Sequence, residues 1–158
     1  MDKVWEVIQG VLTSEIFLTV ISGVLVFVLG QLFNEYFLKP IQSYKQLRAK
    51  IAYNLTLYAH FYMNPLKITQ KNEDYSNASY DLRKLAAEVD SMIELKPFGN
   101  FFIARKTTLR EVSKNLIGLS NGFYSDNCLS TMQNNDTCRK NIYILLKITC
   151  RPEKKNKK

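Results

Sequence analysis

Histidine and paired cysteines are scarce in this 158-residue chain, and their scarcity excludes several kinds of site. The only histidine is His60, and the three cysteines, Cys128, Cys138 and Cys150, include no Cys-x-x-Cys pair. Because zinc sites need several such ligands at short spacing, we expect no metal site. The odd number of cysteines also argues against a disulfide framework.

Motifs for catalysis or cofactor binding are missing as well. We find no phosphate-binding glycine loop, Gly-x-Ser-x-Gly elbow, His-Glu-x-x-His pair or paired carboxylate cluster. Many small helical RNases of bacterial defence use an arginine followed four to six residues later by a histidine, whereas Arg48 precedes His60 by twelve residues. We therefore expect a protein that is not an enzyme and has no cofactor, with Arg48 and His60 as a candidate polar site.

Charged side chains are absent from one long segment. Residues 16–34 read IFLTVISGVLVFVLGQLFN and lie between Glu15 and Glu35. A helix of this length covers about 28 Å, close to the ~30 Å hydrocarbon core of a bilayer. The pattern predicts a first region, residues 1–38, made of an amphipathic N-terminus with Trp5 as interfacial anchor and one transmembrane helix.

Two other interpretations of this segment stay open. A cleaved signal peptide needs a basic start and a small-residue cleavage site, whereas this start carries Asp2, Lys3, Glu6 and Glu15. A buried helix of a soluble domain usually has a polar, charged stripe, which is missing here. Both interpretations explain the pattern less well than a membrane helix does.

Basic residues are distributed unevenly around the segment. Lys3 precedes it, whereas Lys39, Lys45, Arg48 and Lys50 follow it. Flanking Lys and Arg stay on the cytoplasmic side of a membrane. We therefore expect a single-pass protein of the bacterial inner membrane, with its N-terminus outside and its C-terminal domain in the cytosol.

The chain is basic, with a net charge of +8. Its end, RPEKKNKK, predicts a disordered basic tail over residues 151–158. The anionic inner leaflet is the expected partner of the basic side chains, and a protein or RNA partner is the alternative. The candidate contacts are Arg105, Lys106, Arg110, Lys154, Lys155, Lys157 and Lys158.

The region between span and tail, residues 39–150, predicts a bundle of about four helices, because apolar side chains recur three or four residues apart. The expected helices cover residues 41–63, 75–95, 107–120 and 126–150. The last of these is expected to be interrupted near residues 134–136, or to end as a short strand.

Local signals predict where some of these elements begin and end. Lys39-Pro40 should end the membrane helix, and a capping box of Thr108 and Glu111 should begin the helix over 107–120. Asn121-Gly122 should end that helix. Three acidic residues of the helix over 75–95 are interpreted as a solvated face: Glu88, Asp90 and Glu94.

Small and polar residues gather on one face of the uncharged segment. In lipid, helices associate through small residues and polar side chains, because burial from water provides no driving force between them. We therefore expect a homo-oligomer, in which this polar face could line a pore. The face consists of Thr19, Gly23, Gly30 and Asn34, with Ser22 and Gln31 beside it.

Four stretches, FVLGQLFNEYFLKPIQ, IAYNLTLYAHFYMNP, LRKLAAEV and KNLIGLSNGF, resemble a set of small uncharacterised bacterial membrane proteins with an N-terminal anchor and a helical cytosolic domain. The layout is also similar to membrane-anchored accessory proteins encoded beside CRISPR-associated, RNA-guided RNases. Those accessory proteins form oligomeric pores and carry a degraded HEPN-like RNase fold.

This resemblance implies an all-α chain with a degraded HEPN-like domain. It implies a pore-forming or membrane-perturbing effector of antiphage or stress defence. The alternative function is a membrane-tethered module that recruits a cytosolic partner or nucleic acid to the inner leaflet.

Overall fold

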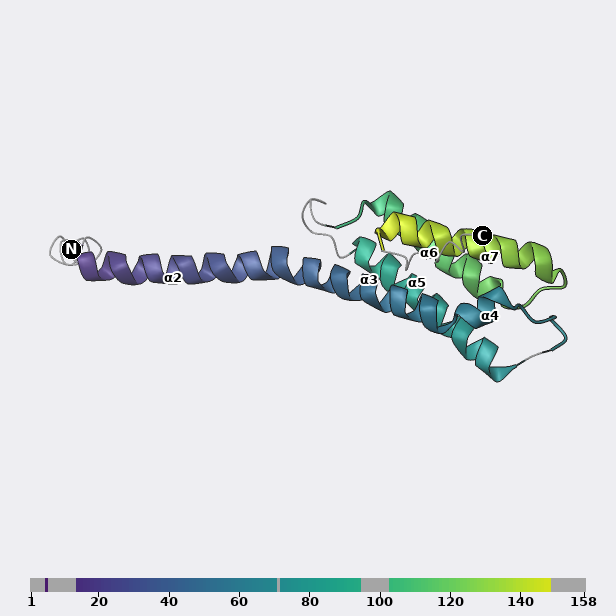
Figure 1. Cartoon of the computed structure of the whole chain (residues 1–158). Coiled ribbons are helices and arrows are strands. Elements are labelled where there is room, and N and C mark those ends of the chain that lie inside the picture. The colour runs from purple at the N-terminus through teal and green to yellow at the C-terminus, as the bar shows by residue number, and fades with distance from the viewer. Residues whose placement is uncertain (1–4, 6–13, 71, 95–102, 149–158) are drawn as a thin grey trace, which may run out of the picture. The chain divides into compact units, whose positions relative to one another are not determined.

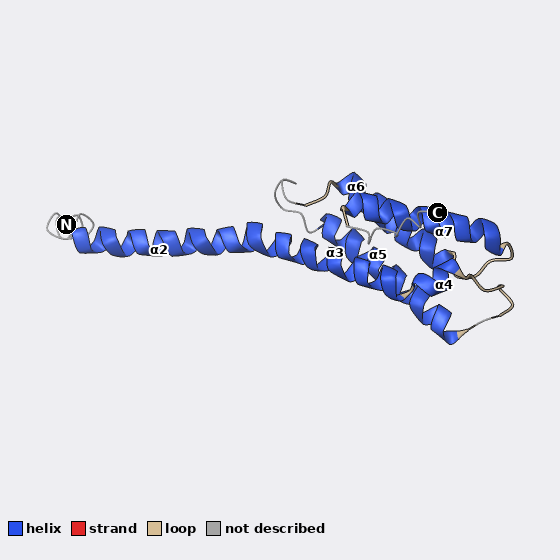
Figure 2. Cartoon of the chain, viewed as in Figure 1, coloured by secondary structure: helices blue, strands red, loops and turns tan. Residues whose placement is uncertain are grey.

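The computed structural model describes Trp5 and residues 14–70, 72–94 and 103–148. Within these residues the chain is helical and contains no strand beyond an isolated bridge between Leu66 and Tyr124 (Figure 2). The elements are α2 (Glu15–Phe33), the π-helix η1 (Asn34–Leu38), α3 (Lys39–Leu57), α4 (Ala59–Met63), α5 (Glu73–Glu94), α6 (Lys106–Asn121) and α7 (Cys128–Leu146) (Figure 1). The predicted class, an apolar N-terminal helix followed by an all-α bundle, is confirmed.

The chain divides into two compact units, Met1–Pro40 and Ile41–Lys158. These are the N-terminal and the C-terminal unit. The predicted amphipathic N-terminus, apart from Trp5, and the predicted tail over residues 151–158 lie outside the described residues.

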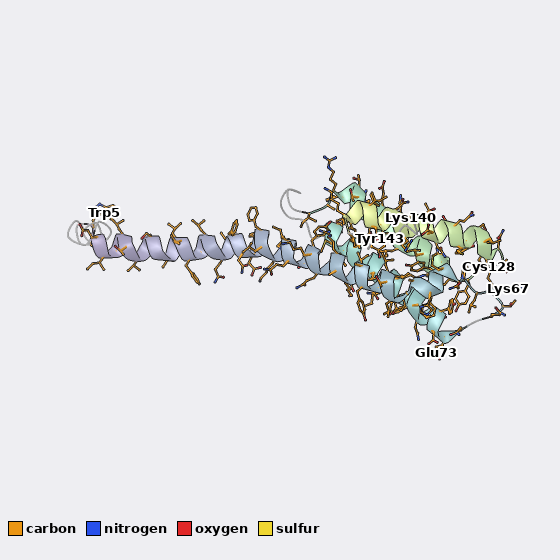
Figure 3. The ribbon with its side chains drawn as sticks, viewed as in Figure 1. Trp5, Lys67, Glu73, Cys128, Lys140 and Tyr143 are labelled. Atoms are coloured by element: carbon orange, nitrogen blue, oxygen red, sulfur yellow. The ribbon has the colours of Figure 1, made fainter. Side chains whose placement is uncertain are left out.

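Helix α2, in the N-terminal unit, contains all of the uncharged segment except Asn34, which begins η1. Ser14 caps it, because its side-chain oxygen accepts a hydrogen bond from the Phe17 backbone N–H at 3.2 Å. None of its residues is buried, and side chains project from both edges of its ribbon in Figure 3. The part of the chain that the structure describes therefore contains one N-terminal helix that is long and apolar enough to cross a membrane. A buried core helix, the second alternative, would not leave this segment uncovered.

Pro40 does not end this helix, contrary to the prediction. Helical backbone continues from Glu15 to Leu57, and the turns just before Pro40 form η1. There the Lys39 N–H bonds to the carbonyl of Asn34, five residues back. A proline ring crowds the carbonyl four residues before it, and a widened π turn makes room for it without breaking the helix.

The core of the C-terminal unit follows the predicted apolar stripes. On α3 the buried side chains are Tyr44, Leu47, Ile51 and Leu55. Helices α5, α6 and α7 lie side by side, with α6 packed against both others (Figure 1). Each fully buried apolar side chain contributes about 1.5–3 kcal/mol, so this shared core accounts for the bundle. Further core residues are Leu82, Leu85, Val89, Leu109, Val112, Leu116, Leu119, Phe123, Ile142 and Leu146.

Two further predictions about helix boundaries are wrong. The helix expected over residues 41–63 breaks at Tyr58, which has φ −93° and ψ 13° and separates α3 from α4. No side chain caps α6, which begins after Arg105, so the capping box of Thr108 and Glu111 does not form. The predicted C-cap, Gly122, is confirmed.

Helix α7 runs without interruption through Asn134-Asn135-Asp136, and no strand follows in its described part. Its N-cap is Asn127, whose side chain accepts from the Ser130 N–H. The expected interruption is wrong because Asn135 is buried and its amide bonds to carbonyls of other segments. Asp136 pairs with Arg139 and Lys140 on the same helix. These contacts hold the polar triplet in the helix.

Candidate membrane-helix face and polar hollow

The predicted polar face of α2 contains hydroxyl groups that are satisfied within the helix. The Thr19 hydroxyl donates to the Glu15 carbonyl at 2.7 Å, and the Ser22 hydroxyl donates to the Thr19 carbonyl at 2.8 Å. Such bonds let a hydroxyl enter a bilayer without an outside partner. Thr19 and Ser22 therefore do not require a neighbouring helix.

The two glycines of α2 leave an open surface. Apart from the adjoining residues and the nearby backbone of α2 itself, a methyl group added at Gly23 or Gly30 would meet no described atom within 4 Å. Seven residues separate the two glycines, so they lie on the same face of the helix. A second helix could approach the backbone closely there.

The carboxamides of Gln31 and Asn34 differ from the hydroxyls. Among the described residues, neither side chain has a hydrogen-bond partner, although the Asn34 backbone takes part in η1. Gln31 lies four residues before Glu35, about 6 Å of helix rise. Glu35 forms an ion pair with Lys39 at the end of the uncharged segment. Of the two carboxamides without a hydrogen-bond partner, Gln31 therefore lies deeper in the uncharged segment than Asn34.

Arg48 and His60 do not form one site in the described structure. Arg48 donates from Nη2 to the carbonyl of Lys147 at 2.9 Å, and its guanidinium lies 5.8 Å from the ring centroid of Tyr44. A cation at the C-terminus of α7 is electrostatically favourable, so this contact ties α3 to α7. Arg48 is thus a structural residue.

His60 is exposed on the short helix α4. Its ring centroid lies 3.8 Å from that of its neighbour Phe61. From Arg48 to Leu57, the end of α3, the helix alone rises about 14 Å. No acid, base or metal ligand of the described residues joins His60, and these residues contain no group of three potential metal ligands.

Three of the predicted basic contacts lie at the start of α6. Arg105, Lys106 and Arg110 are all exposed, and none forms an ion pair with a described carboxylate. They leave a basic surface free for an anionic partner. Lys154, Lys155, Lys157 and Lys158 lie outside the described residues.

Sequence reasoning missed an open hollow between α5 and α6. The volume of this hollow is about 470 Å³. Arg83 lies at one end, where Nε donates to Ser120 Oγ at 3.0 Å and Nη2 donates to Asn121 Oδ1 at 2.8 Å. The full lining is Arg83, Ala86, Ala87, Asp90, Ile117 and Asn121.

Asp90 lines the other part of this hollow and is not merely part of a solvated face. Its Oδ2 accepts a hydrogen bond from Ser113 Oγ at 2.8 Å. Arg83 and Asp90 are seven residues apart on α5, and Ser113 and Ser120 are seven apart on α6. This shared spacing is visible in the sequence, but it does not show that the two faces meet. The two serines interrupt the apolar stripe of α6, and both are buried.

Two ionisable groups elsewhere in the C-terminal unit have clear structural causes for their pKa. A hydrogen bond from the Tyr58 hydroxyl to Asp81, together with burial, raises the pKa of Tyr58 to about 12. Hydrogen bonds from Lys140 and Arg139 lower the pKa of Asp136. The Tyr58 hydroxyl bonds to α5, and Asp136 pairs with side chains of its own helix, α7. Neither residue lines the hollow.

Comparison of the chain with protein-family models, with curated proteins and with solved structures found no match.

Proposed function

We propose that this chain is a single-pass membrane protein that self-associates through α2. Its N-terminus lies outside and its helical unit lies in the cytosol, at a bacterial inner membrane. The uncharged run of residues 16–34 and the absence of buried residues on α2 support the anchor, and the basic residues that follow support the orientation.

The pair of unpartnered carboxamides, Gln31 and Asn34, carries this proposal. An amide left without a hydrogen bond in an apolar medium costs roughly 2–7 kcal/mol, depending on the reference state. The same amides on a second copy supply both donors and acceptors, because each carboxamide can donate and accept. Hydrogen bonds between membrane helices contribute about 0.6–2 kcal/mol each.

The glycines strengthen the same face. Gly23 and Gly30 leave space for the backbone of a second α2, which would bring the amides of two copies within reach. An assembly of several copies would place hydroxyls and amides around its centre. We therefore propose a pore-forming or membrane-perturbing effector of antiphage or stress defence, as the similar layout of the accessory proteins encoded beside RNA-guided RNases implies.

A membrane-tethered binding module is the second candidate. The observation that favours it is the group of exposed cations at the start of α6, Arg105, Lys106 and Arg110, which lack a described acidic partner. Such a surface suits the anionic inner leaflet, or an acidic protein or RNA. Neutralising all three cations should then abolish binding to anionic vesicles or RNA at low salt, without changing the oligomeric state.

The oligomer is tested by measuring the mass of the full chain in detergent by sedimentation equilibrium. The double substitution Gln31→Leu with Asn34→Leu should shift the chain toward monomer. The matched control is Thr19→Val with Ser22→Ala, which removes polar groups of the same face that bond within their own helix. The control should leave the mass unchanged.

The proposal that copies associate through these amides is refuted if the wild-type chain is a strict monomer in detergent. It is also refuted if the amide variant and the control have the same mass. The effector role has its own readout. Expression of the wild-type chain should lower the membrane potential of the host cell, and the amide variant should not. An unchanged potential with an intact oligomer would refute the effector role alone.

A further inference from the structure

The hollow between α5 and α6 contains two opposite charges that do not pair with each other. Arg83 and Asp90 both line it, yet neither forms an ion pair with any described residue. Seven residues separate them on one face of α5, about 10 Å of helix rise. The hollow therefore offers one cationic and one anionic end.

Arg83 is held in place with donors to spare. Its two hydrogen bonds go to Ser120, which is buried, and to Asn121. The carbonyl of Ser120 in turn accepts from the Ser79 hydroxyl at 3.0 Å, so the anchoring residue is itself fixed. A guanidinium has five N–H donors, and those not used here can bind a carboxylate at two points.

Asp90 has a comparable arrangement. Buried Ser113 donates to its Oδ2, and the same hydroxyl lies 3.4 Å from the carbonyl of Ala86. Among the described residues, Oδ1 has no donor. This oxygen can accept a hydrogen bond from an ammonium group.

Apolar side chains line the space between the two charges. Ala86 and Ala87 are short, which is why the hollow exists, and Ile117 faces them from α6. The volume of about 470 Å³ lies in the range of small-molecule sites. The middle of a ligand would therefore be aliphatic.

From these contacts we propose that the α5–α6 hollow binds a small zwitterion with an aliphatic middle. Its carboxylate binds Arg83 and its ammonium binds Asp90. Arg83 and Asp90 are about 10 Å apart along α5, so the ammonium and the carboxylate of the ligand must be several ångströms apart. In an α-amino acid both groups are attached to one carbon, whereas a six-carbon ω-amino acid or a short peptide separates them. Failure of this site would leave the membrane role of α2 untouched.

The test uses the full chain in lipid nanodiscs and 6-aminohexanoate as the probe. Backbone amide NMR signals of Ala86, Ala87 and Ile117 report binding at the hollow itself. Two analogues retain one charge each, namely N-acetyl-6-aminohexanoate and 6-aminohexanamide, and glycine retains both charges at short spacing. We expect saturable shifts with 6-aminohexanoate and binding about ten-fold weaker for each of the other three.

Two variants assign the ends. Asp90→Asn keeps an acceptor for Ser113 and should bind 6-aminohexanoate no better than its N-acetyl analogue. The Arg83→Gln variant should bind 6-aminohexanoate no more tightly than it binds 6-aminohexanamide. The matched controls are Lys84→Gln and Glu94→Gln, which lie on α5 outside the lining and should bind like the wild type.

Absence of saturable shifts up to about 10 mM would overturn the proposal, since weaker binding corresponds to less than about 3 kcal/mol. Equal binding of 6-aminohexanoate and its single-charge analogues would overturn it as well. If Arg83→Gln unfolds, Asp90→Asn still decides, because unchanged zwitterion preference in a folded Asp90 variant contradicts the assigned ends.

Discussion

Asn135, in the middle of α7, donates from its side-chain nitrogen to the carbonyl of Gly122 at 2.9 Å. The same nitrogen donates to the carbonyl of Tyr62 at 2.8 Å. Gly122 is the C-cap of α6 and Tyr62 belongs to α4, so one buried amide joins three helices. Buried carbonyls need such partners, because water cannot reach them.

The first prediction concerns Gly122→Ala. A methyl group at this position would lie 2.0 Å from Asn135 Oδ1 and 2.7 Å from its Cγ, so α6 and α7 would have to move apart. Overpacking of this kind costs about 1–3 kcal/mol, which a thermal melt followed by circular dichroism in mild detergent would detect. Gly118→Ala is the control, because its methyl group would lie 3.3 Å from Cys138 Sγ, and a better helix propensity offsets that contact. Equal melting temperatures for both variants would contradict the prediction.

The second prediction concerns Asn135→Ala. The variant loses both side-chain hydrogen bonds and leaves the carbonyls of Tyr62 and Gly122 buried without this donor. We expect about 2–4 kcal/mol of destabilisation in urea unfolding, because each unsatisfied buried group costs about 1–3 kcal/mol. Asn134→Ala, at an exposed position of the same helix, should change the unfolding free energy by less than about 0.5 kcal/mol. A similar effect of both changes would mean that the buried amide is dispensable.

Regular apolar periodicity predicted α5 and α6 nearly to their ends, because the stripes of these helices face one core. The errors occur where one contact overrides a local signal. Pro40 stays in a helix because η1 widens the preceding turn, and Asn135 stays in α7 because distant carbonyls accept its amide protons. Arg83 and Asp90 were missed because their partners, Ser120 and Ser113, come from a different helix, and a sequence pattern does not show which faces meet.

The third prediction concerns Tyr58, whose hydroxyl donates to the Asp81 carboxylate. This bond and burial raise the pKa of Tyr58 to about 12, above its ordinary value of 10.0. The bond therefore stabilises the fold fully below pH 10, and its contribution falls as the pH rises from 10 to 12. Tyr58→Phe should cost about 1 kcal/mol at pH 8 and nearly nothing at pH 12. Tyrosinate absorbance at 295 nm, compared between wild type and variant, should assign one late-titrating group to Tyr58.

The fourth prediction concerns Asp136, which pairs with Lys140 and Arg139 within α7. The hydrogen bond from Lys140 is the main cause that lowers the pKa of Asp136 below its ordinary value of 3.8. The pairs thus stabilise the fold above that value, and the stabilisation disappears as the pH falls through the lower pKa of the folded state. Asp136→Asn should cost about 0.5–1 kcal/mol at pH 7 and progressively less below pH 4. An effect that stays constant from pH 7 to pH 2.5 would show that the ion pairs contribute nothing.

The last prediction concerns the open glycine face of α2. The double substitution Gly23→Leu with Gly30→Leu fills the space that a second copy would need, while it makes the segment more apolar and keeps it in the membrane. Under the proposed self-association, the oligomer measured in detergent should dissociate, because helix backbones can no longer approach closely. Leu25→Ala with Leu32→Ala is the matched control, since these residues share the same seven-residue spacing and lie on the opposite face. If the control dissociates the oligomer and the glycine variant does not, copies of α2 meet through the leucine face.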